Sequence, residues 1–151
     1  YKEAGVYGID ENERMRGDKM DLHHFGIATV NMEESISLYE MLGFKCEGGI
    51  VEDTDRNLRI VFMSNGSTLI ELIQKLDKDA KSPVDAFLGK GKNQSIYHSC
   101  YLVPDLEKSI DKLREYNFIL TDEPKPAIAF HGKRVCFLYN HFVGMIELCE
   151  S

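Results

Sequence analysis

A repeat with an offset of 74 residues carries the side chains in this sequence that could do chemistry. The repeat places His24 on His98, and each copy closes with Ile-Glu-Leu, which contains Glu71 in the first copy and Glu147 in the second. The second closing motif lies two residues beyond the strict offset, a difference that one longer loop absorbs. Imidazole nitrogens and carboxylate oxygens are good ligands for divalent transition metals. Two copies of a half-site with one histidine and one glutamate therefore predict one shared metal site.

The predicted strands place these glutamates on faces that are otherwise apolar. Because side chains alternate along a strand, Glu71 shares a face with Leu69 and Ile73, and Glu147 is flanked by apolar residues in the same way. A carboxylate in such a face destabilises the fold unless a cation or a hydrogen-bond partner compensates it. No Lys or Arg stands at a repeated position where it could neutralise both glutamates. A metal is therefore favoured over a salt-bridge network. The alternative to a metal site is that the two histidines form hydrogen bonds at strand ends and that the strands of the two glutamates have the opposite register, so that both glutamates point to water.

Each half of the sequence predicts the same order of elements: strand, helix, strand, strand, strand. Asn31 and Asp105 are the expected N-caps of the two helices, and Gly43 and Asn117 are the residues expected to end them in a left-handed conformation. Asn65-Gly66 predicts a tight hairpin in the first half. The apolar stripe of the first helix is expected at Met32, Ile36, Tyr39 and Leu42, and that of the second at Leu106, Ile110 and Leu113. The strands are expected at residues 24–30, 44–50, 57–64 and 67–74 in the first half, and at 118–122, 134–139 and 144–149 in the second.

The length of 151 residues predicts one globular domain. Residues 1–20 lie outside the repeat and are predicted to be an N-terminal extension. Residues 21–150 form the predicted domain, in which module one spans about 21–75, a linker about 76–95 and module two about 96–150. Ser82-Pro83 predicts a short helix start within the linker.

Charge and composition limit the classes of partner. A net charge of -7 argues against nucleic acid and anionic membranes, because both require a cationic protein surface. The four cysteines have no Cys-x-x-Cys spacing and are expected to be reduced thiols. We therefore expect a cytoplasmic protein that binds a small-molecule substrate.

Several segments of the sequence resemble the vicinal oxygen chelate superfamily, most closely the methylmalonyl-CoA epimerases and next glyoxalase I. The resemblance covers about residues 21–150. The segments that carry it are His23 to Val30, Leu42 to Phe44, Thr68 to Leu72, Ser82-Pro83, Tyr97-His98, Asp122 to Pro126, His131 to Leu138 and Ile146 to Glu150.

The resemblance implies an α+β fold, glyoxalase-like, in which two tandem βαβββ modules form one curved mixed sheet with a metal cleft. It places the four metal ligands of the family on His24, Glu71, His98 and Glu147, with Glu147 as the first candidate for the catalytic base and Glu71 as the second. It also implies a homodimer. The ligand set suits one divalent ion, namely Ni, Co, Mn or Zn.

The resulting hypothesis is a divalent-metal-dependent isomerase that abstracts a proton alpha to a carbonyl through a metal-stabilised enolate. Its substrate is expected to be an acyl thioester similar to methylmalonyl-CoA. One alternative is a glyoxalase I-type lyase, which acts on the hemithioacetal of glutathione, as a lactoylglutathione lyase does, or of another thiol. Another is a ligand-binding member of the fold without catalysis. An iron dioxygenase is disfavoured, because Glu71 would occupy a position that such enzymes keep open.

Some residues outside the quartet also invite a functional interpretation. Some epimerases carry a second acid/base glutamate in the strand before the hairpin, but residues 58–61 contain no carboxylate. Lys133 and Arg134 could meet a carboxylate or a phosphate at the mouth of the cleft, although a basic pair at a strand start is more often solvated. Cys100 could line the pocket, although a small buried residue is the commoner role.

Overall fold

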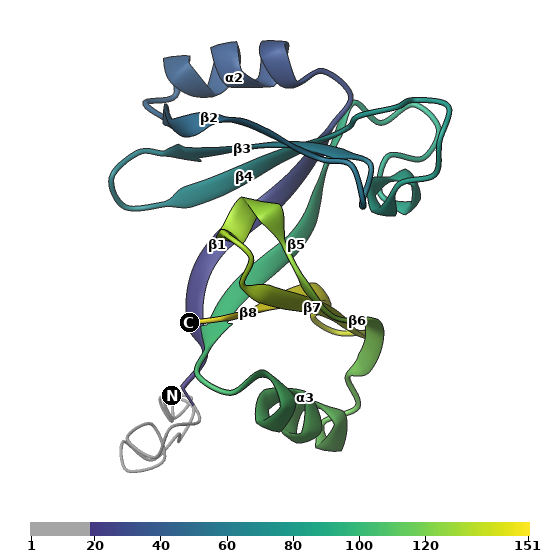
Figure 1. Cartoon of the computed structure of the whole chain (residues 1–151). Helices are drawn as coiled ribbons and strands as arrows, with labels where there is room; N and C mark the ends of the chain where they lie inside the picture. Colours follow the sequence, from purple (N-terminus) through teal and green to yellow (C-terminus); the bar gives the residue numbers. More distant parts are fainter. Residues whose placement is uncertain (1–18) are drawn as a thin grey trace, which may run out of the picture.

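The computed structural model of the protein describes residues 19–151, and its centre is an eight-stranded sheet with the order β2-β3-β4-β1-β5-β8-β7-β6 (Figure 1). The first half contains β1 (Asp21–Thr29), α2 (Met32–Met41), β2 (Lys45–Asp53), β3 (Leu58–Ser64) and β4 (Leu69–Lys75). A short 3-10 helix, η1 (Pro83–Ala86), lies between the halves. The second half contains β5 (Gln94–Val103), α3 (Leu106–Glu115), β6 (Ile119–Pro126), the 3-10 helix η2 (Ile128–Phe130), β7 (Arg134–Asn140) and β8 (Gly144–Glu150).

The two halves repeat one topology and meet along β1 and β5. In the first half β1 pairs in parallel with β4, and in the second half β5 pairs in parallel with β8. The two opening strands pair with each other in the antiparallel sense, which joins the halves into one mixed sheet. This arrangement confirms the predicted α+β fold with two βαβββ halves. Most of the predicted extension, residues 1–18, lies outside the described residues, and the proposed domain and module boundaries stay predictions.

Side-chain alternation decides which residues reach each face of the sheet. The neighbours of Glu71 in β4, Ile70 and Leu72, belong to the buried cluster that packs beneath α2. The neighbours of Glu147 in β8 belong to an equivalent cluster beneath α3. Both glutamates therefore point to the opposite face, which we call the inner face, and Figure 1 shows that the curved sheet wraps around this face while the two helices lie outside it.

The predicted helix signals are largely confirmed. The Asn31 side chain accepts a hydrogen bond from the Glu34 amide, and Asp105 caps α3 in the same way. Gly43 and Asn117 adopt the left-handed conformation expected after the helices, with φ of 95° and 64°. The apolar stripe of α2 was predicted one residue too far: Leu42 lies beyond the helix and is 71% exposed. Among the described residues, no helix is long and apolar enough to cross a membrane.

Asn57 ties the segment between the halves to the turn that joins β2 and β3. Its Nδ2 donates to the carbonyl oxygens of Asp77, Ala80 and Lys81 at 2.9, 3.3 and 3.2 Å. Its Oδ1 accepts from the Asp77 amide at 2.6 Å. The Asn57 backbone is left-handed, with φ of 56°, a conformation that Asn tolerates and Ala does not. Asn57 therefore anchors the start of this segment, and the buried side chain of Val84 anchors η1 further along it.

Replacing Asn57 is expected to destabilise the fold in two separable steps. Asn57→Gly removes the side-chain hydrogen bonds while keeping the left-handed backbone accessible, and should lower the free energy of unfolding by about 1–3 kcal/mol. Asn57→Ala adds backbone strain and should cost about 1 kcal/mol more. Urea denaturation of the two variants measures both steps. Equal stabilities of the two variants would show that backbone strain at this position is unimportant.

Candidate metal centre

The structure brings the four predicted ligands together at the middle of the inner face. His24, Glu71, His98 and Glu147 come from β1, β4, β5 and β8, the four central strands, and their ligating atoms all lie within 4.8 Å of one another. All four side chains are buried, with at most 4% of each residue exposed. Gly26 of β1 pairs with Glu71 on one side and with His98 on the other, so the strand register itself assembles the cluster.

The distances within the cluster suit a single metal ion. The Nε2 atoms of His24 and His98 are 3.3 Å apart. Oε1 of Glu71 lies 3.7 Å from Nε2 of His24 and 3.5 Å from Nε2 of His98, and the corresponding distances for Glu147 are 3.5 and 3.4 Å. Four ligands placed about 2.1 Å from a central ion in a tetrahedron would be about 3.4 Å apart. The donor atoms therefore surround a point where a divalent cation fits.

The charge of the cluster also favours binding of a cation. The ion-pair partners that the described residues offer to Glu71 and Glu147 are the two histidines. Oε1 of Glu147 is fully buried and has no hydrogen-bond partner within the described part of the chain. A buried, unsatisfied carboxylate oxygen is costly, and native structures rarely keep one without an ion or water. The residues present therefore fit a divalent metal.

The pKa shifts follow from the same burial and charge. Burial alone would raise the pKa of Glu147, but interactions with His98 and then His24 outweigh it and lower that pKa. Burial alone would lower the pKa of His98, but Glu147 and then Glu71 outweigh it and raise that pKa. Both shifts favour positive charge next to ionised carboxylates. Burial, followed by the charge of His24, lowers the pKa of the neighbouring His23.

Small residues leave room for the two imidazoles. A Cβ atom on Gly26 would lie 2.2 Å from Cε1 of the His98 ring and 2.6 Å from both ring nitrogens. Cys100 stands opposite His24 in the antiparallel pair, as Gly26 stands opposite His98. A glycine is therefore required at position 26 to leave space for the His98 ring. Cys100 is a small buried residue beside the site, the commoner of the two roles that its sequence position suggested.

Aromatic rings enclose the histidines. Phe130 of η2 stacks on His24, with ring centroids 5.8 Å apart, and Phe62 packs against the same imidazole edge-on at 5.3 Å. Tyr97 and Phe137 contact His98 at 4.6 and 5.4 Å. In Figure 1, η2 lies over the inner face between the two halves. These rings exclude water and so strengthen electrostatic interactions within the cluster.

Three cavities surround the site. The small cavity, of about 30 Å³, touches Glu71, His98 and Glu147. The Tyr97 cavity, of about 500 Å³, shares Tyr97 and Arg56 with the small cavity as walls. A third, which we call the His23 cavity, measures about 350 Å³; it shares the Phe130 wall with the small cavity and is lined by His23, Glu47 and Lys133, among others. Two larger spaces therefore border the metal centre from different sides.

Arg56 and Glu47 were not identified from the sequence. The Arg56 guanidinium donates to Asp53 at 3.0 Å and to the Pro126 carbonyl at 3.2 Å, and so holds the chain just before η2. Glu47 stands opposite Phe62 in the β2–β3 pair. Neither residue has a counterpart in the repeat. Arg56 reaches the small cavity from the turn between β2 and β3, and Glu47 lines the His23 cavity from β2. The spacing of residues in the sequence therefore did not indicate that Arg56 and Glu47 line these cavities.

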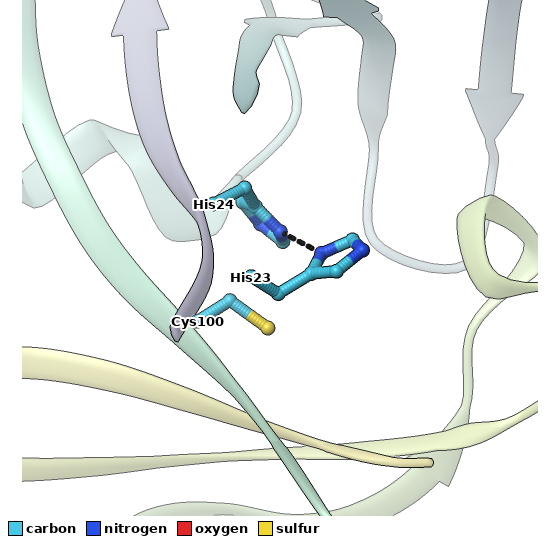
Figure 2. A group of neighbouring side chains, drawn as sticks. All are labelled: His23, His24 and Cys100. Atoms are coloured by element: carbon cyan, nitrogen blue, oxygen red, sulfur yellow. Dashed lines mark hydrogen bonds between the residues drawn. The ribbon is translucent and has the colours of Figure 1, made fainter. Parts of the chain in front are cut away.

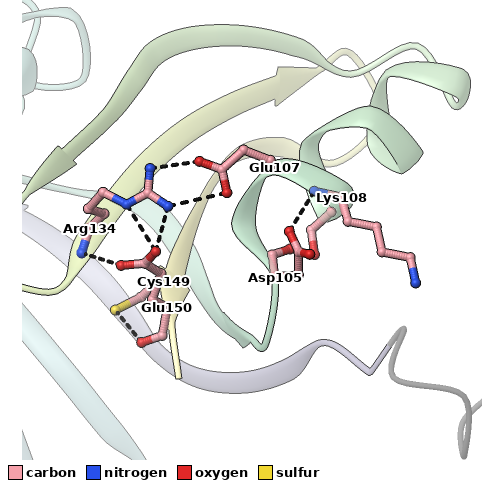
Figure 3. A network of polar contacts seen from close by, with 7 residues as sticks. Asp105, Glu107, Lys108, Arg134, Cys149 and Glu150 are labelled. Carbon is pink, nitrogen blue, oxygen red and sulfur yellow. Dashed lines mark hydrogen bonds and ion pairs between the residues drawn. The ribbon is translucent and has the colours of Figure 1, made fainter.

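The basic pair at the start of β7 divides into two roles. Arg134 binds Glu107 of α3 and Glu150 of β8, with shortest N–O distances of 2.6 Å to each (Figure 3). This network ties the last strand to α3 and engages the Arg134 guanidinium with two carboxylates of the chain, while 38% of the side chain stays exposed. Lys133 lines the His23 cavity. His131 and His141 are not members of the buried cluster.

Comparisons with known proteins agree with this geometry. The sequence model of the Glyoxalase/Bleomycin resistance protein/Dioxygenase superfamily matches residues 23–137. A mitochondrial methylmalonyl-CoA epimerase of Dictyostelium discoideum is 34% identical over 132 residues, which are 86% of this chain and 78% of that protein. An ethylmalonyl-CoA/methylmalonyl-CoA epimerase of Cereibacter sphaeroides is 32% identical over 119 residues, or 78% of this chain and 87% of that protein. The crystal structure of methylmalonyl-CoA epimerase from Mycobacterium tuberculosis superposes with a TM-score of 0.70 at 25% identity, covering 87% of this chain and 86% of that one.

Adding a methyl group at Gly26 should displace the His98 ring and weaken metal binding. We expect Gly26→Ala to lower divalent-metal affinity by about 10–100-fold, the range found when a ligand loses its orientation. Equilibrium dialysis with Zn or Co measures the change, and circular dichroism checks that the variant is folded. Gly49→Ala is the matched control, because a Cβ at Gly49 meets nothing within 4 Å. Unchanged affinity in a folded Gly26→Ala variant would contradict the proposed ligand role of His98.

Metal removal should destabilise the protein. A free metal concentration of 100 times the dissociation constant adds about 2.7 kcal/mol of stability. For a chain of this length that corresponds to a rise in Tm of about 5–10 °C. Thermal unfolding after chelation and after metal addition measures the difference. His98→Ala should bind no stoichiometric metal and show no rise, so full retention of metal by this variant would show that the quartet is not the site.

Proposed function

This chain belongs to the Glyoxalase/Bleomycin resistance protein/Dioxygenase superfamily, and from that membership we propose that it is a divalent-metal-dependent epimerase acting on a methylmalonyl-CoA-like acyl thioester. The observation that carries the proposal is the buried quartet of His24, Glu71, His98 and Glu147 at the centre of the sheet. Its chemistry suits abstraction of a proton next to a thioester carbonyl. The identities of 34% and 32% to two proteins named as epimerases support the substrate class.

The residues of the site divide the work of proton transfer. The two histidines and two glutamates would hold the ion, which when bound supplies positive charge for the oxygen of the enolate. Both carboxylates of the quartet border the small cavity and are candidates for the base. Glu147 is our first assignment and Glu71 the second. Although burial opposes the shift, the interactions with His98 and then His24 lower the pKa of Glu147 and keep its carboxylate ionised near neutral pH, which is the form that a base requires. Inversion of that carbon then requires delivery of a proton on the face opposite to the one that the base deprotonates.

The Tyr97 cavity fits the thioester portion of such a substrate. It combines aromatic walls with the cationic side chains of Arg56, Lys81 and Lys125 and with the carboxylates of Asp55 and Asp122. Arg56 and Lys125 are ion-paired with Asp53 and Asp122. Apolar walls accommodate an acyl chain, and the cations attract carboxylate or phosphate groups. Arg56 and Tyr97 line both this cavity and the small cavity beside the metal ligands. Because glutathione is also anionic, the preference for an acyl thioester over a hemithioacetal is supported by the identities to the two epimerases rather than by this cavity. The homodimer and the cytoplasmic location stay predictions.

The reaction itself provides the test. Metal-loaded protein incubated in deuterated water with one epimer of methylmalonyl-CoA should produce the other epimer with deuterium at the α-carbon. Glu147→Gln keeps an oxygen ligand but cannot accept the proton, so it should lower the rate by about 10²–10⁴-fold. Metal content measured on the same samples separates loss of the base from loss of the ion.

Three outcomes would redirect the proposal. Absence of both inversion and α-deuteration in metal-loaded protein would overturn the epimerase assignment. Turnover of methylglyoxal with glutathione or another thiol, measured in parallel, would then identify a glyoxalase-type lyase. Binding of the acyl thioester with neither reaction would identify a ligand-binding member of the fold.

A further inference from the structure

His23 lies at an irregularity in β1, immediately before the ligand His24. In the β1–β5 pair, Leu22 stands opposite Tyr101 and His24 opposite Cys100, so His23 has no residue of its own across the ladder. One extra residue on one strand is a β-bulge, which re-aims a side chain that would otherwise alternate to the other face. The bulge therefore allows two successive histidines to approach the same site.

The two imidazoles make direct contact through their Nδ1 atoms. These atoms are 2.8 Å apart, and Figure 2 shows the His23 ring directed at the His24 ring. The ring planes are nearly perpendicular, at 79°. On its other side, Nε2 of His24 points into the quartet, 3.5 Å from Glu147 and 3.7 Å from Glu71. His24 thus uses one nitrogen toward the metal centre and the other toward His23.

This contact determines where the protons must lie when a metal is bound. A histidine that binds a metal through Nε2 carries its remaining ring proton on Nδ1. In His24 that proton can be donated only if His23 presents an unprotonated Nδ1 as acceptor. The proton of His23 then lies on its own Nε2, and His23 is also a wall of the 350 Å³ His23 cavity. One hydrogen bond therefore fixes the tautomers of both rings.

The other ligand histidine has no such partner. Tyr97 precedes His98 as His23 precedes His24, and Tyr97 also lies at a bulge, since Gly26 pairs with His98 and the next residue of β1 pairs with Ile96. Tyr97 contacts the His98 ring edge-on at 4.6 Å, but Nδ1 of His98 has no hydrogen-bond partner among the described residues. The polar support is therefore specific to the first half of the site.

We propose that His23 is a positioning residue that holds His24 in the tautomer with Nε2 free for the metal, and thereby sets the affinity of the site for divalent ions. The inference rests on the metal centre of the proposed function but not on the epimerase reaction. A competing arrangement uses His23, His24 and Cys100, whose potential ligand atoms also lie within 4.8 Å of one another, as a second cation site. The 2.8 Å hydrogen bond argues against it, because the shared proton occupies one nitrogen and its acceptor.

Two substitutions separate the acceptor from the bulk of the side chain. His23→Leu removes the acceptor and keeps a large side chain, whereas His23→Asn places Oδ1 close to the position of Nδ1. We expect His23→Leu to weaken Zn binding, measured by chelator competition, by about 10–100-fold. His23→Asn should bind Zn nearly as tightly as the wild type. His141→Asn is the control for removal of a histidine outside the cluster.

Nitrogen NMR of the histidine rings gives a second readout that is independent of activity. In Zn-loaded wild-type protein, long-range proton–nitrogen spectra should show His24 protonated at Nδ1 and His23 protonated at Nε2. The Nδ1 proton of His24 should exchange slowly with water in the wild type and in His23→Asn, and rapidly in His23→Leu. Unchanged Zn affinity or unchanged proton exchange in His23→Leu would overturn the inference, as would binding of two Zn ions per chain in the wild type but one in His23→Leu. Wild-type protein that binds no stoichiometric Zn would overturn the metal centre and the inference with it, whereas Zn binding without epimerisation would overturn the proposed reaction alone.

Discussion

Two carboxylates on an apolar sheet face impose the main constraint on this molecule. Glu71 and Glu147 are held there by strand alternation, since their neighbours in sequence form the cores beneath the two helices. Burial of both without compensation would cost more than a marginally stable domain can offset. The two imidazoles supply part of the compensation, and the four side chains together could hold a divalent ion that would supply the rest. Gly26 makes space for one of those imidazoles. The site is thus part of the core, so metal occupancy and stability are linked.

Duplication explains how one site arises from two halves. The equivalent strands β1 and β5 pair in the antiparallel sense, which places the His24 of one half beside the His98 of the other. Each half also carries a bulge at the residue before its histidine, at His23 and at Tyr97. The bulges are equivalent but the side chains are not. A symmetric backbone therefore supports an asymmetric environment, with polar support for one ligand and aromatic packing for the other.

The sequence predicted what depends on local chemistry and on the repeat. Helix caps at Asn31 and Asp105 are short-range hydrogen bonds, and the strand period of two placed Glu71 and Glu147 on one face. Leu42 was wrongly assigned to the apolar stripe because periodicity does not indicate where a helix loses contact with its sheet. The roles of His23 and Arg56 depend on a bulge and on contacts across 70 residues, which no spacing rule reports. The alternation of apolar and polar residues cannot predict a bulge, because it assumes that the strand register is unbroken.

Reactivity and selectivity have different structural sources in this fold. The repeated residues form the metal centre, and any change in them alters charge in the core. The unrepeated residues lie around that centre and are not among its four buried ligands. They include Arg56 and Lys125 in the Tyr97 cavity and Lys133 in the His23 cavity. Arg56 connects these two groups of residues, since it lines both the Tyr97 cavity and the small cavity and holds the chain before η2, whose Phe130 stacks on His24. If the chain is the proposed epimerase, substitutions in the cavity walls can change its substrate preference without altering the four buried ligands that would carry out proton transfer.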